Sequence, residues 1–316
     1  MSRYVVVGAG PVGRETARLL AERGEEVLLA SRSGRGEEVP GARRVAVDAA
    51  DAEALTGLVQ GASAFFNCVN PGDYTRWERA WPPVAAALLT AAERTGALLA
   101  VTGNLYPYGP VDGPMTEDLP DRPNGHKSAL RARMSADAFA LHEAGRAHVV
   151  EVRGSDYTGR GVRGNGHLTL AGSMAIGGRT AWMIGDPGVL HSWTNVTDMA
   201  RALVAVADAP RTWGRVWHAP TNPARSGRDA VADLCRAAGV PVRGVRGFPP
   251  GTLGLGGLAV PLLRELKETA YQFRRDYVLD SSAITRELGL APTPWEESCR
   301  VTAEDLLAQR AERAAA

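Results

Sequence analysis

The sequence predicts an α/β fold: a Rossmann-type doubly wound parallel sheet with a smaller C-terminal substrate region. Short apolar runs alternate with amphipathic segments of helix length through residues 3–150. A glycine-rich turn links the first apolar run to the first amphipathic segment, and no internal repeat interrupts the chain. This alternation is typical of a parallel sheet with both faces covered, because each crossover lays a helix on the sheet.

The first half of the chain supplies six expected strands. They are short and apolar, and they lie at residues 4–7, 27–30, 44–47, 64–68, 98–101 and 148–152. Helices are expected at residues 12–23, 51–59, 81–94 and 128–143. Pro82 and Pro83 lie near the start of the third helix, where proline is tolerated. A loop rich in Pro, Gly and Asp, residues 104–125, follows the fifth strand.

The second half is less regular, and residues 156–190 are glycine-rich with little periodicity. Helices are expected at residues 197–207, 226–238, 260–273 and 294–313, with a further strand at 215–218. We therefore expect a dinucleotide-binding domain over residues 1–160, completed by about residues 190–218. Residues 161–189 and 219–316 would form the substrate-binding region.

The composition is that of an ordinary globular protein. The chain has 316 residues, and its net charge of +1 excludes the basic surplus typical of nucleic-acid binders. No apolar run approaches the roughly 18 residues that span a bilayer, and the N-terminus lacks a signal-peptide pattern, so we expect a cytoplasmic protein. Three scattered cysteines and six ungrouped histidines predict neither a disulfide framework nor a metal site.

The turn after the first strand carries a G-x-G-x-x-G motif, Gly8-Ala9-Gly10-Pro11-Val12-Gly13, which opens the first helix. In this setting Gly8 permits the tight turn, Gly10 lets the backbone approach a pyrophosphate, and Gly13 lets the helix pack against the strand. The helix N-terminus then offers N–H groups and a positive dipole end to the phosphates. The motif predicts a dinucleotide cofactor; the alternative is a tight turn without a ligand.

The choice of cofactor depends on the end of the second strand. NAD sites usually place Asp or Glu there, on the ribose 2′-hydroxyl. This chain has Ser31-Arg32-Ser33 instead, and its next acid is Glu37. Arg32 can pair with a 2′-phosphate, helped by either serine hydroxyl, and Arg35 is a weaker candidate. The pattern predicts NADP(H), against the alternative that Arg32 is a solvated surface residue.

Further segments resemble the extended short-chain dehydrogenase/reductases, the NAD-dependent epimerase/dehydratase family, over nearly the whole chain. Besides the glycine turn they are Asp48-Ala49, Asn67-Cys68-Val69-Asn70, and residues 104–109, 117–120, 153–157 and 193–200. The resemblance implies that Asp48 and Ala49 lie near adenine, that Asn67 and Val69 line the cofactor, and that Ser155 lies near nicotinamide. It also implies a homodimer through helices 81–94 and 128–143, whose apolar positions could alternatively pack on the sheet.

The chain departs from this family at the catalytic pair. The family spaces a tyrosine and the lysine that activates it as Y-x-x-x-K, but Pro123 stands four residues before Lys127 and Leu263 four before Lys267. Asn124 lies near the expected position of the tyrosine. The resemblance implies that Lys127 keeps the lysine's other task, binding the nicotinamide ribose. The alternative is a solvated lysine at a helix start.

Other groups would then serve the reacting oxygen. Thr102 and Asn104, near the family's Ser/Thr position, can hydrogen-bond a carbonyl oxygen. The candidate proton donors are Tyr106, Tyr108, Tyr157 and His126, and each has the alternative of a packing role. No tyrosine has a lysine four residues later, so we expect hydride transfer not to depend on one replacement tyrosine. Water or a substrate hydroxyl can deliver the proton instead.

Aromatic side chains predict an apolar substrate pocket. Tyr74, Trp77 and Trp81 recur at helical spacing, either as a wall for a flat substrate or as a core or oligomer face. The residues expected to contact substrate are Asn70, Tyr74, Trp77, Tyr157, Met183, Trp193 and Tyr271.

Together these features predict an NADPH-dependent oxidoreductase that reduces a carbonyl of a small, hydrophobic or aromatic natural-product-type metabolite. One alternative is an epimerase or dehydratase that retains its NAD(P), although the missing tyrosine opposes chemistry that begins by oxidising an alcohol. Another is a non-catalytic NADP(H)-binding sensor, which Lys127 and the full substrate region oppose. Substrate, stereochemistry and direction stay open.

Overall fold

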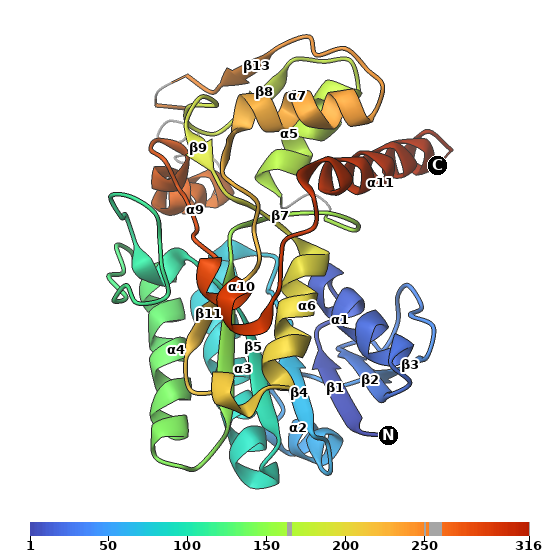
Figure 1. Ribbon diagram of the computed structural model, residues 1–316, viewed down its shortest axis with the longest axis vertical. Coiled ribbons are helices and arrows are strands. Elements are labelled where there is room, and N and C mark those ends of the chain that lie inside the picture. The colour runs from blue at the N-terminus through green and yellow to red at the C-terminus, as the bar shows by residue number, and fades with distance from the viewer. Residues whose placement is uncertain (163–165, 250, 253–260, 316) are drawn as a thin grey trace.

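A seven-stranded parallel sheet forms the centre of the molecule (Figure 1). The computed structural model describes residues 1–162, 166–249, 251–252 and 261–315. The strands, in sheet order, are β11 (Val216–His218), β6 (Val149–Gly154), β5 (Leu98–Asn104), β4 (Ala64–Asn67), β1 (Arg3–Val7), β2 (Glu26–Ser31) and β3 (Ala42–Ala46). The order reverses between β1 and β4, and ligands of such sheets bind outside the carboxyl ends at this switch point.

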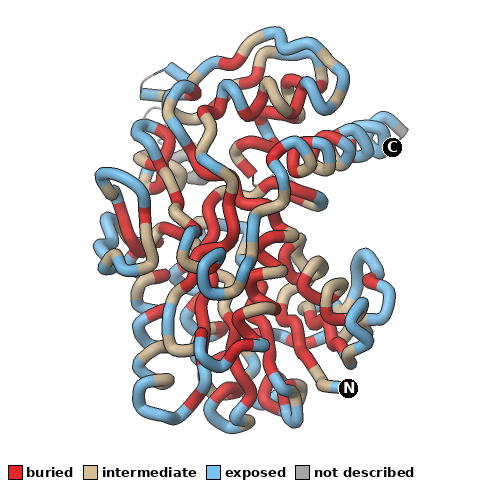
Figure 2. Tube along the Cα trace, viewed as in Figure 1, coloured by how far each residue is buried: buried red, intermediate tan, exposed pale blue. Residues whose placement is uncertain are grey.

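Helices cover both faces of the sheet. On one face α1 (Pro11–Glu22) packs with α6 (Val196–Ala207); on the other lie α2 (Ala52–Val59), α3 (Trp77–Thr95) and α4 (His126–Glu143). Strand β1 serves both cores, because Val6 joins the first and its neighbours Val5 and Val7 join the second. A continuous apolar run is what a parallel strand between two covered faces requires. Figure 2 shows the buried residues concentrated in these central strands.

The remaining elements lie mostly beyond the carboxyl ends of the strands (Figure 1). They are β7 (Asp156–Thr158), α5 (His167–Ile176), β8 (Ala181–Met183), β9 (Leu190–His191), β10 (Trp193–Asn195), β12 (Arg225–Ser226), α7 (Gly227–Ala237), β13 (Val245–Gly247), α9 (Pro261–Thr269), α10 (Ser282–Leu288) and α11 (Trp295–Ala315). Helices α5, α7 and α11 share a separate core that contains Leu168, Val231 and Leu306.

The predicted fold class is confirmed, and two element predictions are wrong. No helix was expected between residues 156 and 190, yet α5 lies there. Its buried residues form one face, but the opposite face carries the exposed apolar residue Leu170, so the sequence shows little contrast between the two faces. Helix α3 begins at Trp77, so Pro82 and Pro83 lie inside it and not at its start. Their missing N–H groups leave the carbonyls of Glu78 and Arg79 to water, since both residues are exposed. Of the helix expected over 260–273, Val260 lies outside the described residues, and α9 gives way to a 3₁₀ turn, Ala270–Phe273.

The faces of α3 and α4 that were predicted to form a dimer are largely buried within the chain itself. Val84, Leu88 and Ala91 of α3 are buried in the second core, as is Ala138 of α4. On α4, Ala129 is exposed, and Met134 and Leu141 are half-buried. The homodimer therefore stays a prediction. Fewer apolar side chains of these two helices are exposed for its interface than the sequence pattern suggested. Among the described residues, no helix is both long and apolar enough to cross a membrane.

Candidate functional site

The glycine turn is tight toward the protein and open toward solvent. Gly8 has a φ of +108°, and a Cβ there would lie 2.5 Å from the carbonyl of Cys68. A Cβ on Gly13 would lie 1.8 Å from the Gly8 carbonyl oxygen, so only glycine lets α1 pack this close to β1. An added Cβ on Gly10 would meet no atom within 4 Å. Pro11 occupies the first position of α1. The backbone thus leaves space for a phosphate group at the helix N-terminus.

An open hollow of about 620 Å³ lies beside the end of β2. Its lining is Ala9, Arg14, Ser31, Arg32, Ser33, Arg35, Gly36, Glu37 and Arg44. The Ser31 hydroxyl is buried and has no hydrogen-bond partner among the described residues. Arg14 pairs with Glu37 at 2.5 Å, and Arg44 donates to backbone carbonyls of the loop, including that of Glu37 at 2.6 Å. Arg32 is exposed at the rim. The hollow is therefore rich in guanidinium groups, and the carboxylate of Glu37, which also lines it, is already paired with Arg14.

Polar residues at the other strand ends shape the backbone. The Asp48 carboxylate accepts the Ala50 N–H at 3.0 Å, and Ala49 is buried in the second core. Asn67 is 2% exposed, and its Oδ1 accepts the Val69 N–H at 3.2 Å. Ser155, after β6, donates its N–H to Thr194 Oγ1 at 3.0 Å. These residues lie at the carboxyl ends of β3, β4 and β6, where the sequence places them.

Two tyrosine hydroxyls meet beside the end of β5. Those of Tyr74 and Tyr106 lie 3.2 Å apart, and Asn104 Oδ1 accepts the Tyr106 N–H at 3.2 Å. Burial raises the pKa of both phenols, and the Asp156 carboxylate raises it further. Both hydroxyls therefore stay protonated and can donate. Thr102 is turned toward β4, with its Oγ1 3.5 Å from Cys68 Sγ.

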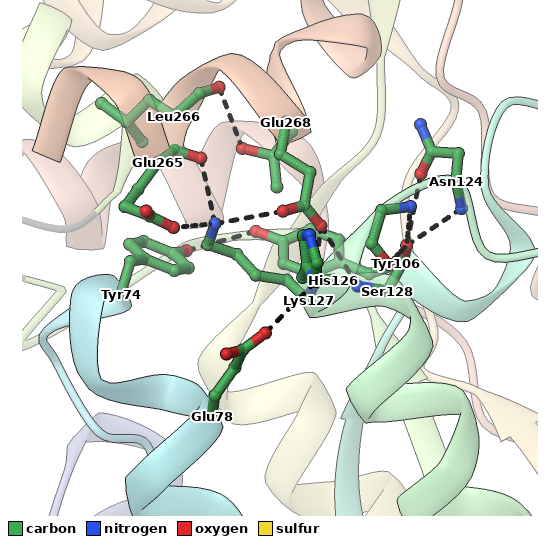
Figure 3. A network of polar contacts seen from close by, with 12 residues as sticks. Tyr74, Glu78, Tyr106, Asn124, His126, Lys127, Ser128, Glu265, Leu266 and Glu268 are labelled. Atoms are coloured by element: carbon green, nitrogen blue, oxygen red, sulfur yellow. Dashed lines mark hydrogen bonds and ion pairs between the residues drawn. The ribbon is translucent and has the colours of Figure 1, made fainter. Parts of the chain in front are cut away.

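Asn124 precedes α4, and Ser128 lies four residues later in the first turn of this helix (Figure 3). Ser128 Oγ accepts the N–H groups of Asn124 at 3.0 Å and Gly125 at 2.9 Å, which caps the helix. Lys127 is 4% exposed, and its ammonium contacts the carboxylates of Glu265 and Glu268 on α9. The ammonium expected on the nicotinamide ribose is thus engaged by α9.

A different cation lies near the phenols. Arg131, one turn further along α4, is 7% exposed, and its Nη2 donates to the Thr102 carbonyl at 3.0 Å. Its guanidinium carbon lies 4.8 Å from the ring centroid of Trp81, and its charge acts on the phenols of Tyr74 and Tyr157. The sequence analysis missed this residue, because nothing in its neighbours distinguishes it from the chain's many other arginines.

Two of the other candidate donors have structural partners. The Tyr108 hydroxyl lies 2.9 Å from His218 Nε2, whose ring is held in turn by the Asp280 carbonyl oxygen at 2.8 Å. His126 is exposed and lies 3.3 Å from Glu78. Burial raises the pKa of Tyr157, which packs half-buried against the first core.

The expected substrate residues are divided between two places. Tyr74 lies beside Tyr106, and Tyr271 lies in a cluster with Tyr108 and Tyr277. Trp77 is 3% exposed in the second core, with its ring 4.8 Å from that of Tyr74. By contrast, Met183 and Trp193 are 2% and 3% exposed in the α5–α7–α11 core, and Asn70 is exposed. Asp156, His191 and Tyr277 were missed, since strands far apart in sequence bring them together. No group of three His, Cys, Asp or Glu within the described ranges could hold a metal ion.

The sequence profile of the NAD dependent epimerase/dehydratase family matches residues 4–218. The chain belongs to this family. The matched span holds all seven strands of the sheet, the glycine turn and the start of α4. It is an enzyme family whose chemistry depends on NAD. No curated protein shows significant similarity to this sequence.

Solved structures of dehydratases and epimerases share the fold. The dTDP-glucose 4,6-dehydratase from Bacillus anthracis str. Ames, in complex with NAD, has a TM-score of 0.81 and 16% identity over 98% of both chains. The dTDP-glucose 4,6-dehydratase from Streptomyces venezuelae, with NAD and TYD bound, has a TM-score of 0.80 and 21% identity over 99% of this chain and 98% of that one. The UDP-glucose 4-epimerase from Brucella ovis, in complex with NAD, has a TM-score of 0.79 and 17% identity over 97% and 98%. At these identities the likeness shows the fold alone.

Proposed function

We propose that this family member binds a nicotinamide dinucleotide and prefers the phosphorylated form, NADP(H). The observation that carries the preference is the hollow at the end of β2. There, exposed Arg32 and the unpartnered hydroxyl of Ser31 stand where an acid would bind a ribose 2′-hydroxyl. Arginine can bind a phosphate through two parallel hydrogen bonds. The hollow's carboxylate, Glu37, does not oppose this because Arg14 pairs with it.

The reacting groups lie at the end of β5. When bound, the dinucleotide supplies or accepts a hydride at its nicotinamide ring. Tyr74 and Tyr106 present two protonated hydroxyls 3.2 Å apart, with the positive charge of Arg131 near Tyr74. In our proposal these hydroxyls hold the substrate's reacting oxygen and donate a proton to it. Their raised pKa values keep both phenols protonated, so neither can act as a base, while an alkoxide formed by hydride transfer is basic enough to take a proton from either.

This arrangement favours carbonyl reduction over alcohol oxidation. Oxidation needs a base. The position four residues before Lys127 carries Pro123, and Asn124 lies beside it, so neither residue supplies one. We therefore propose that the chain reduces a carbonyl of a small hydrophobic or aromatic molecule and consumes NADPH.

The comparisons favour a second candidate, an epimerase or dehydratase that retains its cofactor. The family description names these two reactions, and the solved structures described above are dehydratases and an epimerase. An enzyme of this kind takes a hydride from an alcohol and returns it within the catalytic cycle, so it consumes no net NADPH. It would need a base other than the tyrosine–lysine pair.

One experiment separates the two candidates. The protein is incubated with NADPH and a panel of ketones and aryl carbonyl compounds while the absorbance of the reduced nicotinamide is followed. The reductase proposal predicts that one carbonyl causes stoichiometric loss of NADPH. Conversion of a substrate without net loss of NADPH would support the epimerase or dehydratase instead. Cofactor binding with no conversion of any substrate would favour a sensor.

A further inference from the structure

A buried ion pair lies on the C-terminal side of the candidate site, and the reaction proposed above does not use it. Asp156 begins β7 and His191 ends β9. His191 Nε2 lies 2.7 Å from Asp156 Oδ2, and its Nδ1 lies 3.2 Å from the backbone oxygen of Gln272. Both ring nitrogens of His191 are thus engaged, one by the Asp156 carboxylate and the other by a backbone oxygen.

The carboxylate is the accessible half of this pair. The Asp156 side chain is 22% exposed, whereas that of His191 is 3% exposed. Burial opposes ionisation of Asp156, but the hydrogen bond from His191 holds its pKa below the usual range. His191 thus hydrogen-bonds one carboxylate oxygen of Asp156, Oδ2. The other oxygen, Oδ1, has no hydrogen bond among the described residues and can accept one from a ligand.

Two phenols beside this pair have unsatisfied hydroxyls. The ring of Tyr277 lies 5.2 Å from the ring of His191, and Tyr271 lies 6.1 Å from Tyr277. Tyr277 is only 4% exposed. Both hydroxyls are buried, and within the described part of the chain neither has a partner in good hydrogen-bonding geometry. Each hydroxyl acts only weakly on the other. Burying an unpaired hydroxyl is unfavourable, and a ligand that completed the hydrogen bond would remove that cost.

The same groups lie next to the proposed reacting centre. Asp156 and Tyr277 both act electrostatically on Tyr106, which shares its hydroxyl contact with Tyr74. The Asp156 carboxylate and the Tyr277 phenol therefore lie within electrostatic range of the reacting hydroxyls.

Resting on the function proposed above, we propose that Asp156, Tyr271 and Tyr277 form the substrate-recognition subsite, and that it takes a neutral, hydroxyl-bearing molecule. Substrate hydroxyls can donate to the carboxylate and pair with the phenols. A nucleoside diphosphate is disfavoured, because Asp156 repels it. The nearby ammonium of Lys127, 5.8 Å from the ring of Tyr74, is already neutralised by two glutamates.

Thermal unfolding of two matched variants tests the unsatisfied hydroxyl without any substrate. Tyr277→Phe removes a hydroxyl that has no partner, whereas Tyr108→Phe removes an equally buried hydroxyl that is bonded to His218. We expect Tyr277→Phe to raise the Tm by about 1–3 °C and Tyr108→Phe to lower it. A Tyr277→Phe variant that loses as much stability as Tyr108→Phe would show that the hydroxyl is structural and would overturn the proposal.

Binding of small probes tests the substrate class. Catechol and myo-inositol serve as neutral hydroxyl-bearing probes and UDP as the diphosphate, each titrated into the NADPH-loaded protein. We expect at least one neutral probe to bind, and Tyr277→Phe to weaken it about ten-fold while the Kd for NADPH stays within two-fold. Saturable UDP binding, or neutral probes that bind neither protein or both equally, would contradict the proposal. If the wild-type protein bound no NADPH, the proposed function would fail, but the comparison of Tm values would still decide the role of Tyr277.

Discussion

Replacing Lys127 with methionine separates two roles for this side chain. The family resemblance implies that its ammonium binds the nicotinamide ribose. In the structure the ammonium lies between Glu265 and Glu268 and joins α4 to α9 (Figure 3). The first role predicts weaker cofactor binding in the variant, and the second predicts a less stable protein with unchanged cofactor affinity.

The expected loss of stability follows from burial. The Lys127 side chain is 4% exposed, and those of Glu265 and Glu268 are 24% and 18% exposed. Removing one partner of a fully buried ion pair costs about 3–5 kcal/mol. Water reaches both glutamates, and Glu268 still accepts the backbone N–H of residue 127 at 2.7 Å. We therefore expect a smaller loss of about 2–3 kcal/mol, which lowers the Tm by about 4–10 °C.

The matched control is Lys267→Met, which changes the chain's other lysine. Lys267 is exposed on α9, so its replacement is expected to change stability by less than about 0.5 kcal/mol. Stability is measured by urea and thermal unfolding, and NADPH affinity by fluorescence titration. We expect NADPH affinity to stay within about three-fold in both variants. A Lys127→Met variant as stable as the wild type but about ten-fold weaker for NADPH would refute this reasoning and favour the ribose contact.

Three further predictions concern the donor pair, pH and assembly. Tyr74→Phe or Tyr106→Phe alone should lower kcat by no more than about ten-fold, because the neighbouring hydroxyl remains. The double variant should lower kcat by about a hundred-fold or more. A thousand-fold lower kcat in either single variant would contradict this prediction. Burial lowers the pKa of His167 to about 4, so the unfolded chain binds the proton first. The free energy of unfolding should therefore fall as the pH drops from about 6.5 to 4, and it should fall less steeply in His167→Phe. For the homodimer, light scattering should give twice the chain mass of 33.4 kDa, and a mass of one chain at micromolar concentration would exclude it.

Local patterns were enough to predict the sheet and the cofactor turn. Strands β1, β2, β4, β5 and β6 each carry a short apolar run, and the glycine motif follows β1 and opens α1. Helix α5 escaped prediction because its exposed face carries apolar residues such as Leu170, which hides the contrast between a buried and a polar face. The early start of α3 escaped because water can serve the carbonyls that Pro82 and Pro83 leave without a donor.

The site was less predictable because its contacts join distant segments. That Ser128, and not Lys127, stands four residues after Asn124 can be read from the sequence. The direction of the Lys127 side chain cannot, since its partner Glu265 lies 138 residues away. Asp156 and His191 are 35 residues apart and carry no local motif. Unsatisfied hydroxyls such as that of Tyr277 are recognisable only once every neighbour has a position.

In our proposal the chain binds a nicotinamide dinucleotide through the hollow at the end of β2 and selects the phosphorylated form there. Calorimetric titration of NADPH and NADH into the wild type and Arg32→Ala tests it directly. A charged hydrogen bond to the 2′-phosphate contributes about 1.5–3 kcal/mol. NADPH should therefore bind the wild type about ten- to a hundred-fold more tightly than NADH, and Arg32→Ala should weaken NADPH by a similar factor while leaving NADH nearly unchanged. Equal affinity of the wild type for both dinucleotides, or an equal loss of affinity for both in Arg32→Ala, would contradict the proposed selection of the phosphorylated form.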